Sequence, residues 1–244
     1  MHKSIEPTIL YFGTPVAIVS TLNEDGSPNL APMSSVWWLG WSCMLGLDAS
    51  SKTVDNLRRS KSCVLNLPSD TMAASVNGLA LTTGSRNVPI HKKLLGYRHE
   101  ADKFASASLT RAPMTASWPD AVNECPVQLE GEVVHIRPFA VEDSRMAVPA
   151  VAVEIRLLRV HVEESLLMDG HPHRIDPERW HPMIMSFRHL FGRGSKLEQS
   201  TLARGPEETY APWKQGAVRR IAGAALSAWS KHQYAVDAEP NEQK

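Results

Sequence analysis

Short apolar runs separated by polar turns dominate the first half of the chain, and most of them predict β-strands. Residues 15–21 are apolar and β-branched, and a second run at 28–36 follows the turn sequence Asn-Glu-Asp-Gly at 23–26. An Asp-Gly pair between two such runs is typical of a β-hairpin. A run at 44–48 predicts a third strand, and residues 63–67 predict a fourth.

The second half contains the longest strand patterns. Residues 127–136 alternate between apolar and polar positions, and residues 150–162 form a long β-branched run. Residues 51–60 show helical spacing between the third and fourth predicted strands. The segment after Asp169 is polar and rich in His and Pro, which predicts loops. The remaining helical patterns lie at residues 70–79, 101–107, 182–191 and 218–229.

Short strands joined by hairpins, with helices inserted between them, predict a mainly β fold built on an antiparallel barrel. Residues 26–47 contain no charged side chain, a length that would suit a membrane-spanning helix. Pro28 and Pro32 would break such a helix early. We therefore expect two buried strands in this stretch and no membrane span.

Composition narrows the class of protein further. The chain has 244 residues, of which 43% are hydrophobic and 21% charged, enough for a sizeable core in one elaborated domain. Lys plus Arg and Asp plus Glu both number 26. A protein that binds nucleic acid through its phosphates would normally carry a basic excess, so we expect no nucleic-acid partner.

The cysteines are sparse and unpaired in sequence. Cys43, Cys63 and Cys125 form no C-x-x-C motif, which argues against a disulfide scaffold and suits a reducing cytoplasm. Each lies in or beside an apolar run, so we expect buried structural thiols. The motifs of Rossmann, P-loop, zinc-protease and serine-hydrolase proteins are absent from the sequence.

The first candidate site is the start of the predicted helix at 51–60. Ser50 or Ser51 is a natural N-cap, and the first turn carries Lys52 and Thr53 where an acid would usually oppose the helix dipole. Free N–H groups, hydroxyls and one ammonium would form a phosphate cradle. The alternative is an ordinary serine cap followed by a solvated lysine.

Two further segments carry candidate chemistry. Residues 29–38 bring serines and tryptophans to a strand end, which suits either a flat aromatic ligand or a core filled by indoles. Residues 171–181 hold three histidines, but their spacing fits no compact zinc pattern, so we predict no metal site. Instead, the arginines between 174 and 193 could hold the phosphates of a nicotinamide nucleotide, or form a solvated surface loop.

Taken together, these segments resemble the flavin reductase-like, FMN-binding split-barrel family. The resemblance covers residues 14–203. It rests on an ordered series of blocks: PVAIVSTLNEDGSPNLAPMSSVWWLG, SKTVDNLRRSKSCVLNLPS, DKFASASLTRAP, NECPVQLEGEVVHI and HRIDPERWHPMIMSFRHLFGRGSKL.

The resemblance implies a six-stranded antiparallel Greek-key split barrel with inserted helices. It further implies a cytoplasmic homodimer with FMN near the subunit interface. We expect a flavin-binding domain at 1–204, including a His/Arg-rich block at 169–200, and a C-terminal helical extension and tail at 205–244.

The family also suggests residue roles. Its serine-rich strand end contacts the flavin ring and its Ser-Ser-Lys-Thr helix start contacts the phosphate. The implied cofactor-binding residues are Met33, Ser34, Ser35, Val36, Asp48, Ser50, Ser51, Lys52, Thr53 and Asn66. Candidate substrate contacts are Trp37, His173, Arg188 and Arg193. Trp37, Trp38 and Leu39 stand where the family often has Phe or Asn, and the indoles could narrow the nicotinamide approach.

The leading functional prediction is a flavin reductase in which NAD(P)H delivers hydride to flavin N5. The flavin carries that chemistry, which explains why no acid–base pair or nucleophile stands out. One alternative is an FMN-containing oxidoreductase with another electron partner. Another is a non-catalytic FMN-binding or storage protein.

Overall fold

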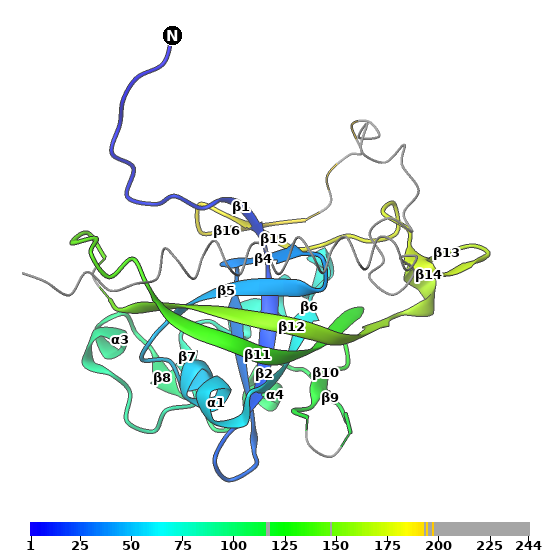
Figure 1. The fold of residues 1–244 in the computed structure, drawn as a ribbon, viewed down its shortest axis with the longest axis horizontal. Helices are drawn as coiled ribbons and strands as arrows, with labels where there is room; N and C mark the ends of the chain where they lie inside the picture. Colours follow the sequence, from blue (N-terminus) through cyan, green and yellow to red (C-terminus); the bar gives the residue numbers. More distant parts are fainter. Residues whose placement is uncertain (116–117, 147, 193, 195–196, 198–244) are drawn as a thin grey trace, which may run out of the picture. The chain divides into compact units, whose positions relative to one another are not determined.

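The computed structural model describes residues 1–115, 118–146, 148–192, 194 and 197. The chain divides into two units, Met1–Lys196 and Leu197–Lys244, and the fold described here is that of the first (Figure 1). The extension predicted at 205–244, with its helix at 218–229, lies outside the described residues.

One antiparallel sheet of seven strands forms the framework, in the order β3-β2-β6-β11-β12-β5-β4. The predicted run at 28–36 divides at Ser34 and Ser35 into two strands, and the other predicted strands are confirmed with small shifts of their ends. The strands are β2 (Ala17–Leu22), β3 (Pro28–Met33), β4 (Val36–Leu39), β5 (Ser42–Asp48), β6 (Ser62–Leu67), β11 (Val127–Phe139) and β12 (Ala150–Val162).

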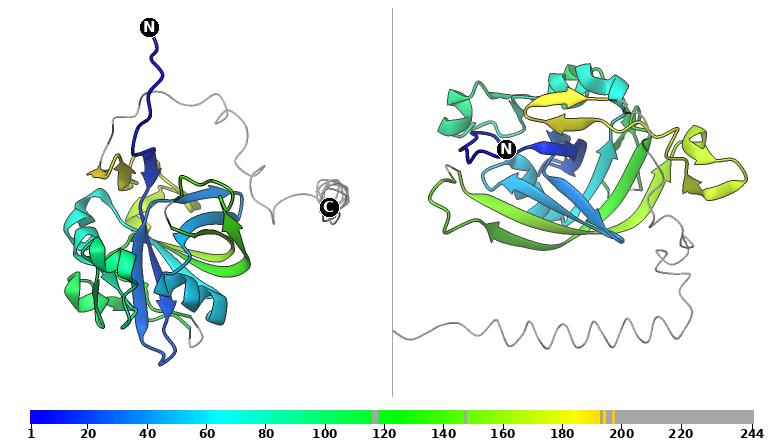
Figure 2. Two further views of the ribbon diagram at one scale, coloured as in Figure 1. Left: turned by 90° about the vertical axis from the view of Figure 1, so that its left-hand side faces the viewer. Right: turned by 90° about the horizontal axis from the view of Figure 1, so that it is seen from above.

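The sheet curls into a split barrel. β3 and β4 occupy opposite ends of the strand order, yet only Ser34 and Ser35 separate them along the chain. The first and last strands must therefore approach each other at this serine pair, although no ladder joins them among the described strands. The curled sheet is visible from two sides in Figure 2. The expected split-barrel class is confirmed, with the short β4 making the seventh strand.

Two core clusters lie on opposite faces of β2. Val19 packs inside the barrel with Leu45 and Ile155, whereas Ile18 packs outside it with Leu30 and Phe104. Side chains alternate along a strand, so both faces of β2 are buried. This double burial explains why residues 15–21 form a continuous apolar run and not an alternating one.

Two of the short helices pack against different clusters. α1 (Lys52–Ser60) contacts β2, and its Val54 and Leu57 belong to the inner cluster. α2 (Ala73–Leu79) follows the 3-10 turn η1 (Asp70–Met72), packs on β3 and belongs to the outer cluster. The polar stretch that follows contains α3 (Ile90–Leu94) and α4 (Lys103–Ser106). The short strand pairs here are β7 (Thr82–Thr83) with β8 (Arg98–His99) and β9 (Arg111–Ala112) with β10 (Ala121–Val122).

The segment after residue 163 corrects the sequence prediction. The helix predicted at 182–191 is instead a hairpin, β15 (Ile184–Ser186) and β16 (His189–Phe191), and β15 pairs with β1 (Phe12–Pro15). The loops predicted after Asp169 contain β14 (His171–Ile175), which forms a second hairpin with β13 (Leu167–Met168) directly after the turn η2 (Glu164–Leu166). Helices long and apolar enough to cross a membrane do not occur in the described part of the chain.

Candidate functional site

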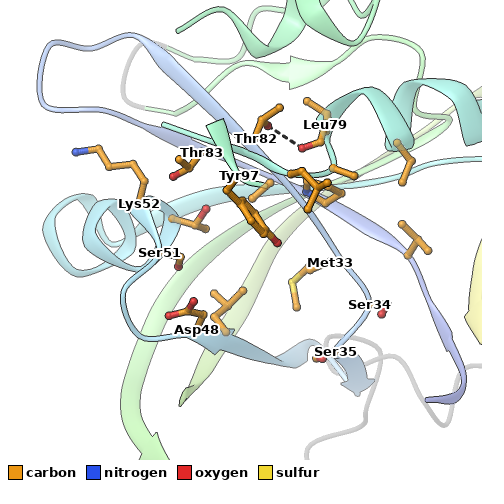
Figure 3. A pocket seen from close by; sticks show the side chains of 18 of the residues that line it. Met33, Ser34, Ser35, Asp48, Ser51, Lys52, Leu79, Thr82, Thr83 and Tyr97 are labelled. Carbon is orange, nitrogen blue, oxygen red and sulfur yellow. Dashed lines mark hydrogen bonds between the residues drawn. The ribbon is translucent and has the colours of Figure 1, made fainter. Parts of the chain in front are cut away.

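A cavity of about 660 Å³ lies along β3 and reaches the barrel seam (Figure 3). Its walls come from β3, from the junction of β5 with α1, and from the end of α2 with the following residues 82–84. Tyr97 and Arg188 are among the lining residues that come from elements distant in sequence. The volume is typical of small-molecule binding sites.

The structure brings most of the predicted cofactor residues into this cavity. Met33, Ser34 and Ser35 line one end of it, and the start of α1 lines another. The predicted residues that line the cavity are Met33, Ser34, Ser35, Asp48, Ser51, Lys52, Thr53 and Arg188.

Three predicted cofactor residues lie elsewhere, and each has a structural reason. Val36 is buried in the barrel core. Asn66 is fully buried, with its amide nitrogen donating to Ile18 O at 2.8 Å and its oxygen accepting from Val122 N at 2.8 Å. It links three strands and has no surface left for a ligand. Ser50 does not line the cavity, and its hydroxyl donates to Asp48 Oδ1 at 2.7 Å.

Of the predicted substrate contacts that the structure describes, Arg188 lines the cavity, whereas Trp37 and His173 do not. Trp37 is exposed on β4 and does not line the cavity, and His173 lies on the separate β13–β14 hairpin. Arg179 closes that hairpin through Leu167 O and Asp169. The His/Arg-rich block therefore does not form one rim: of its described arginines, only Arg188 lines the cavity. Arg193 lies outside the described residues.

The start of α1 presents polar groups to the cavity. Ser51 is the N-cap, and its hydroxyl accepts from Val54 N at 3.3 Å. The backbone N–H groups of Lys52 and Thr53 have no partner within the described chain. Unpaired N–H groups at the positive end of a helix dipole form a site for an anion.

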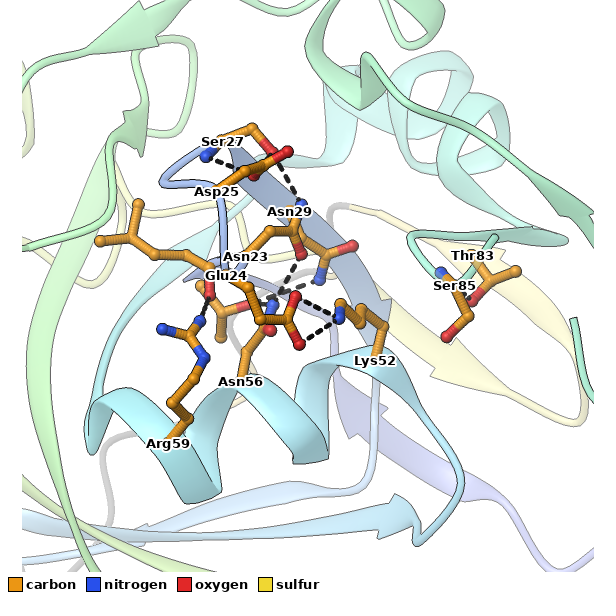
Figure 4. A network of polar contacts seen from close by, with 12 residues as sticks. Asn23, Glu24, Asp25, Ser27, Asn29, Lys52, Asn56, Arg59, Thr83 and Ser85 are labelled. Carbon is orange, nitrogen blue, oxygen red and sulfur yellow. Dashed lines mark hydrogen bonds and ion pairs between the residues drawn. The ribbon is translucent and has the colours of Figure 1, made fainter. Parts of the chain in front are cut away.

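Lys52 itself is engaged by a carboxylate. Its Nζ lies 2.8 Å from Oε1 and 2.6 Å from Oε2 of Glu24, on the β2–β3 turn (Figure 4). The hydrogen bond from Lys52 lowers the pKa of Glu24. The ammonium is thus paired with a carboxylate and points away from the cavity (Figure 3), a state that the sequence did not predict.

Two further lysines line the cavity and were missed by the sequence reasoning. Lys103 is 3% exposed and donates to Leu30 O at 2.7 Å, and burial lowers its pKa to about 8. Lys92 lies 3.1 Å from Asp48 Oδ2 and near the ring of Tyr97. Both come from the Gly-, Pro- and Ser-interrupted stretch after residue 82. The helical pattern at 101–107 and the DKFASASLTRAP block indicated an element and a family there, but no role for either lysine.

Asp48 holds Lys92 in place. Burial alone would raise its pKa, but hydrogen bonds from Ser50 and His91, together with the charge of Lys92, hold the pKa below its ordinary value. An anionic Asp48 fixes Lys92 against the cavity wall. Because Lys92, Lys103 and Arg188 line the cavity with one acid, Asp48, the local charge is positive and favours an anionic ligand.

Asn29 provides a further polar group at this end. It is buried, and its Nδ2 contacts the hydroxyls of Thr21 at 3.2 Å and Thr53 at 3.3 Å. The Oδ1 atom of Asn29 has no hydrogen-bond partner within the described residues. A Cβ at Gly84 would lie 2.6 Å from that atom, so only glycine leaves this space open.

A mainly β split barrel with a cationic cavity at its seam defines the class of this protein, and sequence comparison identifies the family within it. The pattern of the flavin reductase like domain matches residues 9–175, and the chain belongs to the flavin reductase-like family. The family points to a flavin cofactor and to oxidoreductase chemistry.

Individual relatives agree with this assignment. The Bacillus subtilis (strain 168) protein named "Uncharacterized protein YdfE" is 39% identical over 195 residues, which cover 80% of this chain and 91% of that protein. Flavoredoxin of Desulfovibrio vulgaris (Miyazaki F) superposes with a TM-score of 0.66 at 21% identity, covering 84% of this chain and 100% of that one. Nitrilotriacetate monooxygenase component B from Bacillus cereus gives 0.63 at 18% identity, covering 82% and 99%. The two structures share the fold.

Proposed function

We propose that the protein is an FMN-binding flavin reductase that passes hydride from NAD(P)H to flavin N5. The observation that carries the proposal is the cavity itself. The unpaired N–H groups at the start of α1 line the same cavity as Ser34 and Ser35 at the barrel seam. One end suits a phosphate and the other suits a flat ring.

The phosphate end consists of the α1 start and its neighbours. The N–H groups of Lys52 and Thr53 and the Ser51 hydroxyl would hold the phosphate oxygens. Lys52 lines the same space and would reach the phosphate by rotating away from Glu24. The unpartnered Oδ1 of Asn29 would accept a hydrogen bond from a ribityl hydroxyl if the bound flavin opened the wall around it.

The ring end lies at the barrel seam, beside Ser34 and Ser35. Gly46 N donates to Ser35 O at 2.8 Å, and a Cβ at Gly46 would lie 3.2 Å from Cβ of Ser35. Met33 adds an apolar wall, and Ser34 and Ser35 add hydroxyl groups beside it. Bound FMN would supply two-electron transfer, and the chain would bind, orient and shield the ring.

A nicotinamide nucleotide would approach from the side of Arg188, the cation of the β15–β16 turn that lines the cavity. Two other functions remain as outcomes of one measurement, NAD(P)H oxidation with and without added FMN. Turnover only with added FMN supports a reductase that uses flavin as a substrate. Turnover without added FMN supports a tightly held flavin. Absence of turnover with FMN bound supports a binding protein and contradicts the proposed reductase.

Lys52→Ala tests the phosphate site by titration of flavin fluorescence. We expect FMN affinity to fall about ten-fold, since one charge-assisted contact of about 1.5 kcal/mol is lost. Riboflavin lacks the phosphate and should bind the parent and the variant equally weakly. Lys93→Ala, on the exposed side of α3, is the matched control and should change neither affinity. Equal losses for FMN and riboflavin would place the phosphate elsewhere.

A further inference from the structure

We propose that Glu24 is a positioning residue that competes with the flavin phosphate for Lys52. On this proposal Glu24 sets how strongly the protein prefers a phosphorylated flavin over riboflavin. The inference rests on the proposed FMN site and adds a residue that does not touch the flavin.

The β2–β3 turn holds Glu24 in a fixed place above the start of α1. The amide nitrogen of Asn56, on α1, donates to Asn23 Oδ1 at 3.0 Å and to Thr21 Oγ1 at 3.0 Å. Arg59, one helical turn further, donates to Leu22 O. These bonds fasten the β2 side of the turn to the helix (Figure 4). The Glu24 carboxylate is therefore presented to Lys52 by the fold and not by a freely moving loop.

Lys52 stands between two cavities. Besides the flavin cavity it lines a second one of about 460 Å³, bordered by the turn that carries Glu24 and by residues 84–87 and 99–101. The missing Cβ of Gly84, which would lie 3.1 Å from Lys52 Cγ, leaves room beside the lysine stem. The ammonium thus has an acceptor on one side and the unpaired N–H groups of α1 on the other.

Lys52 should bind a phosphate more strongly than it binds Glu24. The Glu24 side chain is 63% exposed and the Lys52 side chain 16% exposed, so water screens the pair and it contributes little. A phosphate monoester carries a charge of about −1.5 to −2 at pH 7 and three acceptor oxygens. It would therefore take Lys52 from Glu24. The affinity for FMN would still be reduced by the cost of breaking the ion pair.

The test is a titration of FMN and riboflavin against the parent and Glu24→Gln. Glutamine keeps the shape of the side chain and removes its charge. We expect FMN to bind about two- to five-fold more tightly to the variant, the range of an exposed ion pair converted to affinity. Riboflavin should be unaffected, because the change acts only through the phosphate.

Two controls separate competition from a general field effect. Asp25→Asn removes the neighbouring negative charge of the same turn, whose carboxylate bonds to Ser27 and not to Lys52, and should leave FMN affinity unchanged. In a Lys52→Ala background, Glu24→Gln should have no effect. A gain with Asp25→Asn, or one that persists without Lys52, would show a through-space effect and overturn the inference.

The remaining outcomes distinguish this inference from the proposed function. If the parent binds FMN and Glu24→Gln leaves the ratio of FMN to riboflavin affinity unchanged, Glu24 does not compete and only this inference is wrong. If the parent does not bind FMN, the proposed function itself fails. Equal thermal unfolding of parent and variant would show that the turn is intact.

Discussion

Lys103 places an ammonium group beside the candidate flavin cavity with little access to water. Burial lowers its pKa from the ordinary 10.5 to about 8 in the folded chain. Between these values the unfolded chain holds a proton that the folded chain has released. The free energy of unfolding therefore rises with pH in this window. The full shift corresponds to about 3 kcal/mol.

Comparison with Lys103→Met isolates this contribution. Urea unfolding of both proteins at pH 7 and pH 10 should show the parent gaining stability relative to the variant by up to about 3 kcal/mol, because other groups titrate equally in both. Above pH 8 the cavity also loses a positive charge, so FMN affinity relative to riboflavin should fall in the parent only. A constant difference in stability across this range would show that Lys103 is not desolvated.

At the residue scale the sequence predicted which residues are buried or cap a helix better than it predicted which side chains pair with each other. The three cysteines are buried as expected, and burial raises the pKa of Cys43 to about 12. The N-cap could be narrowed to Ser50 or Ser51 because capping is local, and the structure assigns it to Ser51. The pairing of Lys52 with Glu24 could not, because it joins residues 28 positions apart across a turn. Lys92 likewise gave no signal, since it faces the cavity from an aperiodic segment.

At the scale of elements, burial decided what could be predicted. The long strands could be predicted because burial of one face gives an alternating apolar pattern and burial of both faces gives a continuous one. The β15–β16 hairpin was mistaken for a helix because its strands are only three residues long and its pairing with β1 is not encoded locally. The same hairpin supplies Arg188 to the cavity, so the error concealed how this residue reaches the site.

The turn of this hairpin yields a prediction of its own. Phe187 and Arg188 both have positive φ, 45° and 67°, a conformation that costs a side-chain-bearing residue about 1 kcal/mol. Arg188→Gly should therefore be more stable than Arg188→Ala by about 1 kcal/mol in urea unfolding. Both variants lose the cation and should raise the KM for NAD(P)H equally. Equal stability of the two variants would show that the turn is unstrained.

At the scale of the whole molecule, exposed apolar side chains gather on neighbouring strands near the mouth of the cavity. We define the aromatic face as Phe12, Trp37, Leu39, Phe187 and Phe191, all exposed and carried by β1, β4 and the β15–β16 hairpin. The rings of Phe12 and Phe187 meet edge to face at 4.9 Å. The adjacent residues Tyr11 and Arg188 line the cavity. Such a face favours association, and we propose that a second copy of this chain covers it.

Leu39→Glu tests this dimer. Leu39 is 76% exposed, so the substitution should spare the fold, yet in a two-fold interface each change acts on both subunits. Losing about 1.5 kcal/mol of apolar burial per subunit, and burying a charge in its place, should weaken the dimer at least about 100-fold. Light scattering at micromolar concentration should then report a dimer for the parent and a monomer for the variant. Leu94→Glu, at an 83% exposed leucine on α3 outside the aromatic face, should remain dimeric. A monomeric parent with flavin bound would contradict the dimer, and a dimeric Leu39→Glu would place the interface away from β4.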